Sequence, residues 1–439
     1  MVAIKTIGRI IRITLLIVLS PTASISQQWF SVGLEGEAIY RLMMPSSSQN
    51  LLAATAPSFS QNRTGKLYQI DPGQELIVSR DSVHALDLAG DDDLLFIAAG
   101  LNAGLVPGLL RSTDQGETWW FSDSGITIYP DMAVTAVAIH PVNSDTVLAG
   151  TGGLHGGALY RSADRGSTWQ LLAEDSIIGG SVTEIAFNPT QPTIFYIGVA
   201  GFANLMRTRN SGNSFEVILN DIPGSVTDIS INPTNPDELY VSLWQGGVHF
   251  SDSGGESWDQ VGEETLSNLV SCVSHNLLEP EVVIIGTAEG LYEWHTTNQS
   301  LALISGELPN SIILSIAWDF GQNILYCGTD DGVFARSFSS STRQGNSLGA
   351  NPRAKLLRAF PNPSNGSMQV IVELDQQTTI GLSLFDILGA QIGTYAEQAG
   401  IQGENILDVS YGNSIPSGQY FIKCVIDDQI IVKKISILR

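Results

Sequence analysis

Carboxylates in expected loops are the side chains of this chain that could carry chemistry. They are Asp131, Asp175, Asp221, Glu289 and Asp331. Two carboxylates facing each other across a groove, roughly 6.5–9.5 Å apart, could serve as general acid and general base in an inverting glycoside hydrolase. An acidic chain places carboxylates in loops without any catalytic role, however, and these loops are short for building a cleft. Glycoside hydrolysis is therefore the alternative interpretation and not the preferred one.

Arginines are the second group to weigh, because three of them converging on one carboxylate would bind an acidic sugar through bidentate contacts. Four recur at one place in a repeated segment, namely Arg111, Arg161, Arg207 and Arg336. This equivalence favours a structural role beside a turn. Only Arg63 and Arg80 fall in other loops of the suitable kind, and two arginines are too few for a sialidase-type site.

The spacing of the remaining polar residues indicates no metal ion, nucleotide or other cofactor. His84, His140 and His275 fall in or beside expected strands, where we expect buried rings with satisfied nitrogens. The acidic runs at 90–93 and 328–332 are more typical of hydrated turns than of calcium sites. The cysteines are odd in number, and we expect each to be a buried thiol that acts as a small hydrophobic side chain: Cys272, Cys327 and Cys424.

A repeated turn indicates which elements would position these residues. The strings "LLRSTDQGETWW", "LYRSADRGSTWQ", "LMRTRNSGNSFE" and "VHFSDSGGESWD" align on glycines that are 50, 46 and 43 residues apart. We call these four turns the boxes. Their main positions are Ser112, Asp114, Gly116 and Trp119 in the first box, Ser162, Asp164, Gly166 and Trp169 in the second, and Trp258 in the fourth. A carboxylate ahead of a turn glycine can accept backbone N–H groups, and a tryptophan can bury apolar area beside the turn, so both roles are structural.

The segments around the boxes predict a propeller. Each box follows two apolar, β-rich runs that are broken by turn signals, and four strands in about 45 residues are typical of a propeller blade. Seven first strands are expected to begin near Ala38, Val83, Val134, Val182, Val226, Leu269 and Ile312. The last unit has only three strands, whereas "QQWFSVGL" (27–34) resembles the segment after a box. We therefore predict seven blades, with residues 28–34 pairing with 332–338 to close the ring.

The boxes resemble the Asp-box, or bacterial neuraminidase repeat, with the pattern Ser-x-Asp-x-Gly-x-Thr-Trp. The resemblance implies a propeller over about 28–338 and fixes no chemistry, because the motif occurs in enzymes, receptors and assembly factors alike. It also implies that the functional face lies opposite the boxes, where the second-to-third turns meet the interblade loops. The candidate ligand-binding residues on that face are Tyr129, His155, Phe202, Trp244 and Asp331.

Composition and the start of the chain predict an exported protein. The formal net charge of −23 argues against nucleic acid and anionic membranes as partners. Residues 1–26 combine three basic residues, an apolar run and small residues, which is typical of a cleaved signal peptide and too short to span a bilayer. No other stretch predicts a transmembrane segment.

The C-terminal region has a composition of its own. Residues 339–354 are rich in Ser, Gly and Asn, which predicts a linker, and alternating strands over 355–439 predict a small β-sandwich. The expected fold class is therefore all-β, with a seven-bladed β-propeller over 27–338 followed by a small C-terminal β-sandwich.

Four motifs of this region resemble the type A sorting domain of the type IX secretion system. The matching residues are Pro361, Asn362, Pro363, Asp386, Gly389, Gly418, Lys433 and Lys434. In that family Pro-Asn-Pro starts the first strand, Asp-x-x-Gly makes a hairpin turn and Ser-Gly-x-Tyr enters a late strand. The resemblance implies export through the periplasm, recognition by the type IX outer-membrane machinery, and release or attachment at the cell surface.

These expectations combine into a secreted or cell-surface binding or scaffold protein. Its loop face would dock a glycan or a protein through aromatic anchors. The alternative is an Asp-box glycoside hydrolase that acts on a polysaccharide.

Overall fold

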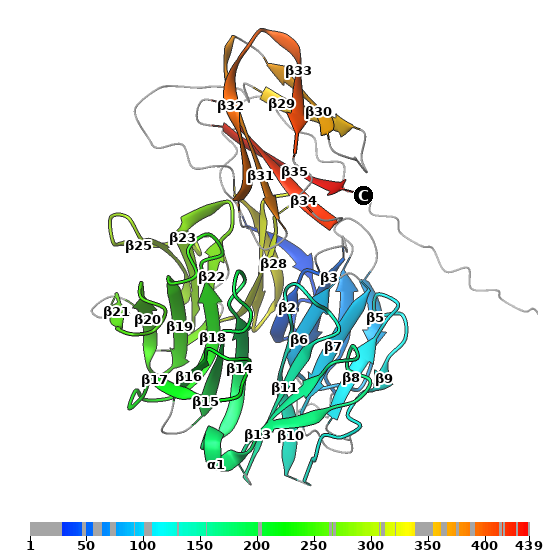
Figure 1. Ribbon diagram of the computed structural model, residues 1–439, viewed down its shortest axis with the longest axis vertical. Coiled ribbons are helices and arrows are strands. Elements are labelled where there is room, and N and C mark those ends of the chain that lie inside the picture. The colour runs from blue at the N-terminus through cyan, green and yellow to red at the C-terminus, as the bar shows by residue number, and fades with distance from the viewer. Residues whose placement is uncertain are drawn as a thin grey trace, which may run out of the picture.

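The computed structural model describes residues 29–437, apart from 46–49, 56–63, 71–75, 92, 101–107, 130, 155, 201–203, 263–265, 267–268, 307, 309–311, 321, 339–353, 361–366, 375–376, 387–390, 412–414, 416–417 and 427–428. The proposed signal peptide and linker therefore lie outside the described residues, save for Ala354. The described chain forms a ring of antiparallel sheets with a smaller β-structure on one side (Figure 1).

Seven four-stranded sheets form the blades, as predicted. Blade one contains β2 (Ile39–Met43), β3 (Leu51–Thr55), β4 (Leu67–Ile70) and β5 (Leu76–Arg80). Blade two contains β6 (Ala85–Asp91), β7 (Leu94–Ala99), β8 (Gly108–Ser112) and β9 (Trp120–Phe121). Blade three contains β10 (Met132–Ile139), β11 (Val147–Gly153), β12 (Leu159–Ser162) and β13 (Gln170–Ala173). Blade four contains β14 (Ser181–Phe187), β15 (Phe195–Ala200), β16 (Leu205–Thr208) and β17 (Glu216–Leu219).

The remaining blades continue this order around the ring. Blade five contains β18 (Ser225–Ile231), β19 (Leu239–Trp244), β20 (Gly247–Ser251) and β21 (Asp259–Val261). Blade six contains β22 (Val270–Asn276), β23 (Glu279–Thr287), β24 (Gly290–His295) and β25 (Ser300–Leu303). Blade seven contains β26 (Ile313–Asp319), β27 (Ile324–Thr329), β28 (Gly332–Ser337) and the N-terminal strand β1 (Phe30–Gly33).

The ring closes through the predicted exchange of a terminal strand. Strand β1 pairs antiparallel with β28, with Phe30 opposite Ala335 and Gly33 opposite Val333. Trp29 donates its indole N–H to Ile304 O at 3.1 Å and so fastens the start of β1 to blade six. Closure by pairing removes the two open sheet edges that would otherwise invite aggregation.

The hydrophobic core is divided among the spaces between neighbouring blades. One cluster joins Leu94 and Phe96 of blade two to Val147 and Tyr160 of blade three, and Trp169 belongs to the same cluster. Because each sheet is covered on both faces by its neighbours, the second strands are almost continuously apolar and buried, as in β7 and β11.

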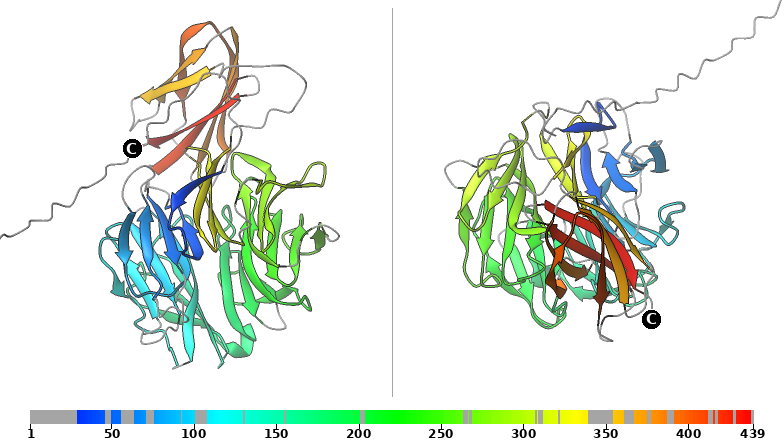
Figure 2. Two further views of the ribbon diagram at one scale, coloured as in Figure 1. Left: turned by 180° about the vertical axis from the view of Figure 1, so that it is seen from behind. Right: turned by 90° about the horizontal axis from the view of Figure 1, so that it is seen from above.

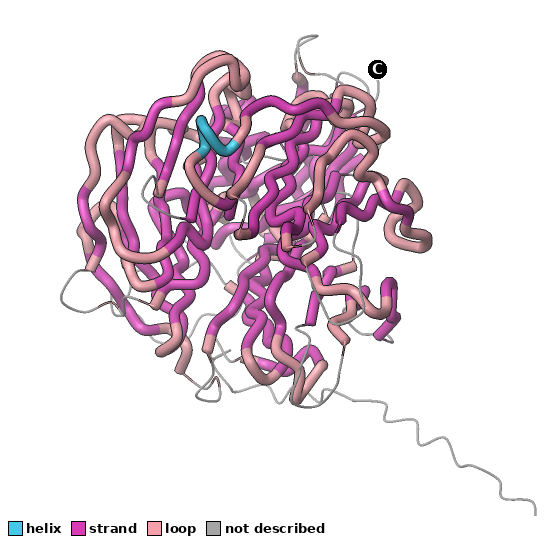
Figure 3. Tube along the Cα trace, turned by 90° about the horizontal axis from the view of Figure 1, so that it is seen from below, coloured by secondary structure: helices cyan, strands magenta, loops and turns pink. Residues whose placement is uncertain are grey.

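The connections between strands lie on two opposite faces of the ring. The first-to-second and third-to-fourth turns share one face, which we call the box face because it carries the boxes. The second-to-third turns and the interblade connections form the other, which we call the loop face. A short helix, α1 (Asp175–Ile178), lies in the interblade connection of the loop face and marks it in Figure 3.

The C-terminal strands form two packed sheets. One contains β29 (Ala354–Phe360), β30 (Ser367–Leu374) and β33 (Gly403–Ser410), and the other contains β31 (Thr378–Asp386), β32 (Gln391–Gly400), β34 (Gly418–Ile426) and β35 (Gln429–Ile437). Alternate side chains from both sheets, among them Val370, Leu384 and Ile422, form one buried core. This is the small C-terminal β-structure that the alternating sequence predicts.

The sorting motifs are described only in part, at strand ends and within the last strand of this β-structure. Strand β29 ends directly before Pro361, so the Pro-Asn-Pro motif does not start the first strand as the resemblance implied. That motif and Gly389 lie outside the described residues. Asp386 ends β31, Gly418 begins β34, and Lys433 and Lys434 lie in β35.

The C-terminal β-structure stands over the box face (Figures 1 and 2). The third strand of blade seven, β28, ends on that face, so the chain leaves the ring there. Lys423 Nζ donates to Leu278 O at 2.6 Å, in the turn between β22 and β23. Burial lowers the pKa of Lys423, although the nearby Glu279 and Glu281 act in the opposite direction.

The cysteines behave as predicted. Cys272, Cys327 and Cys424 are all buried and free of disulfide bonds. Burial raises the pKa of the Cys272 thiol to about 12, so this side chain is an unreactive apolar group at neutral pH.

Candidate functional site

The second box shows how these turns are built. Ser162 Oγ accepts the backbone N–H of Gly166 at 2.8 Å and donates to Asp164 Oδ1 at 2.7 Å. Asp164 also accepts the hydroxyl and the backbone N–H of Thr168, at 2.7 and 2.8 Å. These hydrogen bonds, with the Thr168 hydroxyl foremost, lower the pKa of Asp164 to about 2. The carboxylate is therefore fully engaged within its own turn.

The other boxes keep this network with different residues. Ser112 and Asp114 reproduce it in the first box. In the third box Asn210 Oδ1 accepts the backbone N–H four residues later at 2.9 Å, and in the fourth box Ser253 Oγ accepts the equivalent N–H at 3.1 Å. The turn requires an acceptor at this position but not a charge, so the boxes serve architecture.

The box glycines allow close packing against the preceding blade. Arg165 and Gly166 are both in the left-handed region, with φ of 58° and 80°. A Cβ added to Gly166 would lie 2.6 Å from the Phe96 ring. Glycine is required here by its backbone conformation and also by the absence of a side chain.

The box tryptophans also fasten each blade to the one before it. Their indole N–H groups donate to acceptors in or beside the fourth strand of the preceding blade: Trp119 to Ser79 Oγ at 3.0 Å, Trp169 to Ser122 O at 2.6 Å and Trp258 to Ile218 O at 2.8 Å. The tryptophans are thus engaged in contacts between blades, which leaves their rings unavailable to a ligand.

The repeated arginines also contact neighbouring blades. Arg111 donates to Arg165 O and Ser167 Oγ of the next box, both at 2.8 Å. Arg207 is buried and pairs with Glu256 of the following box at 2.7 Å. Arg63 lies outside the described residues. These contacts provide no cluster of free arginines for an acidic sugar among the described residues of the repeat.

Trp244 is an aromatic residue of the loop face whose backbone is paired on both sides. It ends β19 and pairs with Ser225 on one side, and it forms a bridge with Leu269 on the other. A Cβ added to Gly224 would lie 1.5 Å from Trp244 O, so the interblade connection packs directly against this backbone. The side chain nevertheless remains 39% exposed. Trp244 is therefore an accessible aromatic group on a rigid backbone.

The other candidate residues of the loop face come from other blades or lie outside the described residues. Tyr129 is 51% exposed and lies in the connection from blade two to blade three. Asp331 Oδ1 accepts the backbone N–H of Gly36 at 2.8 Å and so holds two loops together. His155 and Phe202 lie outside the described residues.

The carboxylates weighed for hydrolysis differ in their surroundings. Asp175 Oδ1 accepts the backbone N–H of Gly157 at 3.1 Å, which ties α1 to the adjacent turn. Asp221 and Glu289 are exposed and belong to different blades.

A cluster of charged residues on the first strands was missed by sequence reasoning. Each of its members comes directly after the point where the pairing register of its first strand shifts. The members are Arg41, Asp87, Glu184 and Asp228, and we call them the axial charge cluster. Arg41 Nε lies 3.6 Å from Asp87 Oδ1. The matching acids in "VTEIAF" and "VTDISI" were the available signal, because a charge in the same place of two buried strands requires a shared environment.

The carboxylates of this cluster link neighbouring blades and are shifted by burial. Asp87 Oδ2 accepts the N–H of Val137 at 2.9 Å, and Asp228 Oδ2 accepts the N–H of Val273 at 3.1 Å. Burial raises the pKa of Asp228 to about 6 and raises that of Glu184 further above its ordinary range. The side chain of Arg41 keeps 27% exposure, although its Nε is buried without a hydrogen-bond partner.

Two further properties bear on function. Within the described part of the chain, three or more His, Cys, Asp or Glu side chains are nowhere grouped so that they could hold a metal ion. None of the described helices has the length and apolar character needed to cross a membrane.

Residues 358–438 match the family model of the secretion system C-terminal sorting domain. A type IX sorting domain of this kind indicates export and attachment at the cell surface, and it implies an interaction with the secretion machinery. No curated protein sequence matches the chain.

Several solved propeller structures resemble the chain. YCF48 from Cyanidioschyzon merolae is 13% identical, with a TM-score of 0.53 over 70% of this chain and 98% of its own. The GH74 xyloglucanase from Xanthomonas campestris is 15% identical, with a TM-score of 0.56 over 92% and 67%. PorZ, a surface component of the type IX secretion system of Porphyromonas gingivalis, is 16% identical, with a TM-score of 0.53 over 92% and 60%. At such identities the likeness shows the propeller fold and no activity.

Proposed function

We propose that this seven-bladed propeller with a type IX sorting domain is a binding or scaffold module of the cell surface, and that its loop face docks a glycan or a protein. The observation that carries the proposal is Trp244, an exposed aromatic ring on a backbone held from both sides. Rigid aromatic residues of this kind contribute much of the binding energy at recognition surfaces, because little conformational entropy is lost when they are covered.

The division of labour between the two faces supports this choice. The box face is occupied by turns whose polar groups bond within the propeller, and the C-terminal β-structure stands over it. The loop face lies at the opposite end of the ring, so it remains available to a partner while the sorting domain engages the secretion machinery.

The test is a glycan array combined with pull-down from cell-surface extracts, using the exported protein and the propeller fragment 27–340. We expect Trp244→Ala to weaken binding at least tenfold, since loss of an aromatic anchor costs about 2 kcal/mol. Trp120→Ala is the matched control, because Trp120 is 71% exposed on the outer strand β9. Equal losses in the two variants would remove Trp244 from the binding surface.

A polysaccharide hydrolysis screen on the same proteins tests the alternative function. The exposed carboxylates Asp221 and Glu289 supply its variants, Asp221→Asn and Glu289→Gln. If the unmodified protein hydrolyses a polysaccharide and either variant abolishes this activity, the protein is a glycoside hydrolase and the proposal of a binding module is wrong.

A further inference from the structure

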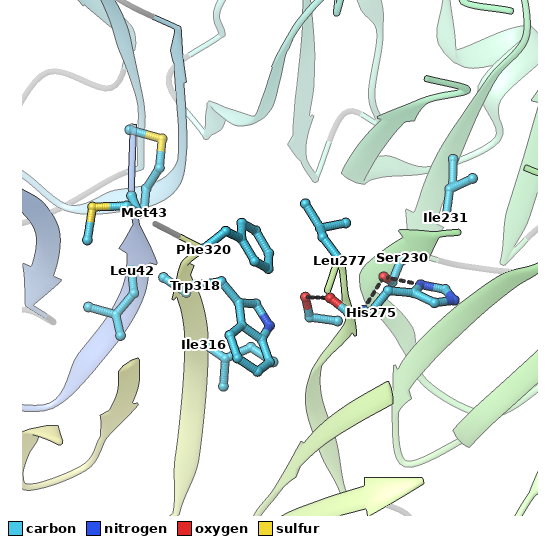
Figure 4. A pocket seen from close by; sticks show the side chains of 12 residues that line it. Leu42, Met43, Ser230, Ile231, His275, Leu277, Ile316, Trp318 and Phe320 are labelled. Atoms are coloured by element: carbon cyan, nitrogen blue, oxygen red, sulfur yellow. Dashed lines mark hydrogen bonds between the residues drawn. The ribbon is translucent and has the colours of Figure 1, made fainter. Parts of the chain in front are cut away.

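A pocket of about 330 Å³ lies on the box face where first strands of the ring meet, and we call it the channel mouth. Its walls come from the ends of the first strands β2, β18, β22 and β26 and from the residues just after them. Leu42, Met43, Ile231 and Leu277 contribute apolar surface, and the described residues that line the pocket include no Asp, Glu, Lys or Arg. Figure 4 shows Trp318 and Phe320 on one side of the pocket and His275 on the other.

The ring of His275 is buried, and only one of its nitrogens has a partner. Nδ1 lies 2.8 Å from Ser230 Oγ, which also accepts the backbone N–H of His275 at 2.9 Å. Nε2 is buried without a hydrogen-bond partner in the protein, and the residue is 2% exposed. The expectation of a fully satisfied ring is therefore wrong for His275. Burial lowers the pKa of His275 to about 3, so the ring is neutral at physiological pH.

Trp318 presents a second unpartnered polar atom. It is 6% exposed, and its Nε1 has no hydrogen-bond partner in the protein. The other five tryptophans that are not exposed all donate their indole N–H within the protein: Trp29, Trp119, Trp169, Trp258 and Trp294. Trp318 thus departs from a rule that the rest of the propeller follows.

The shape of this wall favours a flat ligand. The ring of Trp318 stacks on Phe320 with centroids 5.6 Å apart and planes inclined by 16°. Phe338 supports Trp318 edge-on from behind at 5.1 Å. Met43 and Met44 complete the surroundings with flexible side chains that adapt to an aromatic face.

We propose that this pocket binds an uncharged, flat aromatic small molecule that carries a hydroxyl or carbonyl oxygen. A buried polar atom without a partner costs free energy, and a ligand oxygen that accepts from Trp318 Nε1 removes that cost. The neutral ring of His275 packs edge-on against Tyr240 at 5.3 Å, and neither His275 nor Trp318 carries a charge to pair with an ionic ligand. A sugar fits poorly, because most of its hydroxyl groups would face Leu42, Ile231 and other apolar walls without partners.

The position of the pocket also favours a small molecule over a protein partner. Leu277 lines the pocket, and the next residue, Leu278, accepts the hydrogen bond from Lys423 of the C-terminal β-structure. The pocket mouth therefore lies beside an existing contact. Its volume is at the lower end of the range typical of small-molecule sites.

The test uses p-cresol as the probe, with toluene as a probe of the same shape that lacks the hydroxyl group. The full chain is labelled with 5-fluorotryptophan, and the fluorine signal of Trp318 is assigned among the eight tryptophans by its loss in Trp318→Phe. We expect p-cresol to shift the Trp318 signal saturably and to leave that of Trp120 unchanged. Toluene should bind about tenfold more weakly, because it cannot accept the indole N–H.

The variants separate the indole donor from the hydrophobic wall. Trp318→Phe should weaken p-cresol binding about tenfold and bring it close to that of toluene, whereas Trp120→Phe should leave both affinities unchanged. Circular dichroism verifies that the variants fold. A Trp318 signal that does not respond to p-cresol, or equal binding of the two probes, overturns the proposal. Saturable binding of glucose at the same signal would assign the pocket to carbohydrate instead.

Discussion

The boxes and the channel mouth lie on the same face of the ring, but their polar groups differ: those of the boxes have hydrogen-bond partners, whereas two buried ones at the channel mouth have none. In the second box Ser162, Asp164 and Trp169 all have partners at hydrogen-bond distance. At the channel mouth Trp318 Nε1 and His275 Nε2 are buried without one. A buried polar atom lacking a partner is the feature that needs an explanation, because the fold gains nothing from it.

The comparison explains why the conspicuous motif is a poor guide to function. The box is recognisable in the sequence because each of its residues makes a defined contact within the turn. The acceptor of the backbone N–H can be Asp, Asn or Ser, and the turn still forms. The channel mouth has no local pattern, because Ser230, His275 and Trp318 come from three blades. Residues whose buried polar atoms lack the partners that the repeat supplies elsewhere are therefore the better candidates for a ligand site.

The largest loss of stability is expected for the box tryptophan Trp169, whose indole N–H has a hydrogen-bond partner. Trp169→Ala should lower the free energy of unfolding by about 3–5 kcal/mol, because it removes a buried ring and leaves a cavity. Trp169 is 4% exposed and packs edge-on against Phe96 at 6.4 Å. Urea denaturation of the propeller measures the change, with Trp120→Ala as the exposed control. Similar losses in the two variants would contradict the role of Trp169 between blades.

The second prediction concerns how stability depends on pH through Asp228, a buried carboxylate of the axial charge cluster. Burial raises the pKa of Asp228 from 3.8 to about 6, so between these values the folded state binds more protons than the unfolded state. The contribution of Asp228 to stability is therefore present below pH 4 and is lost as the pH rises through 6. The loss amounts to about 3 kcal/mol, at 1.36 kcal/mol for each pH unit.

Asp228→Asn isolates this dependence. We expect the stability of the variant relative to the unmodified protein to improve by about 3 kcal/mol between pH 4 and pH 7, whatever constant offset the amide introduces. Asp164→Asn is the control. The pKa of Asp164 is lowered, so Asp164 changes the free energy of unfolding with pH only below about pH 4. A difference between Asp228→Asn and the unmodified protein that does not vary with pH would show that Asp228 titrates normally.

The sequence predicted the ring well because its signals are local. Alternating strands, turn glycines and the aromatic residue after each box placed seven first strands within a few residues of their positions, and "QQWFSVGL" indicated the closing strand. The axial charge cluster and the channel mouth were not predicted. Arg41 and Asp228 meet only after the whole ring closes, and one sequence does not reveal which buried strand residues face the axis. His275 was expected to be a buried, satisfied ring because it falls in a first strand, but the folded ring leaves its Nε2 without a partner.

The smallest effect is expected where the unpartnered donor itself is removed. Trp318→Phe keeps an aromatic ring on Phe320 and deletes an N–H group that has no partner, so the free energy of unfolding should fall by no more than about 1 kcal/mol. Trp169→Phe is the matched variant, because the same substitution there leaves Ser122 O without its donor. We expect its loss to exceed that of Trp318→Phe by about 1–3 kcal/mol in parallel urea denaturations. If the two losses were equal, Trp318 Nε1 would have a stabilising partner in the folded protein, and the contrast between the boxes and the channel mouth would fail.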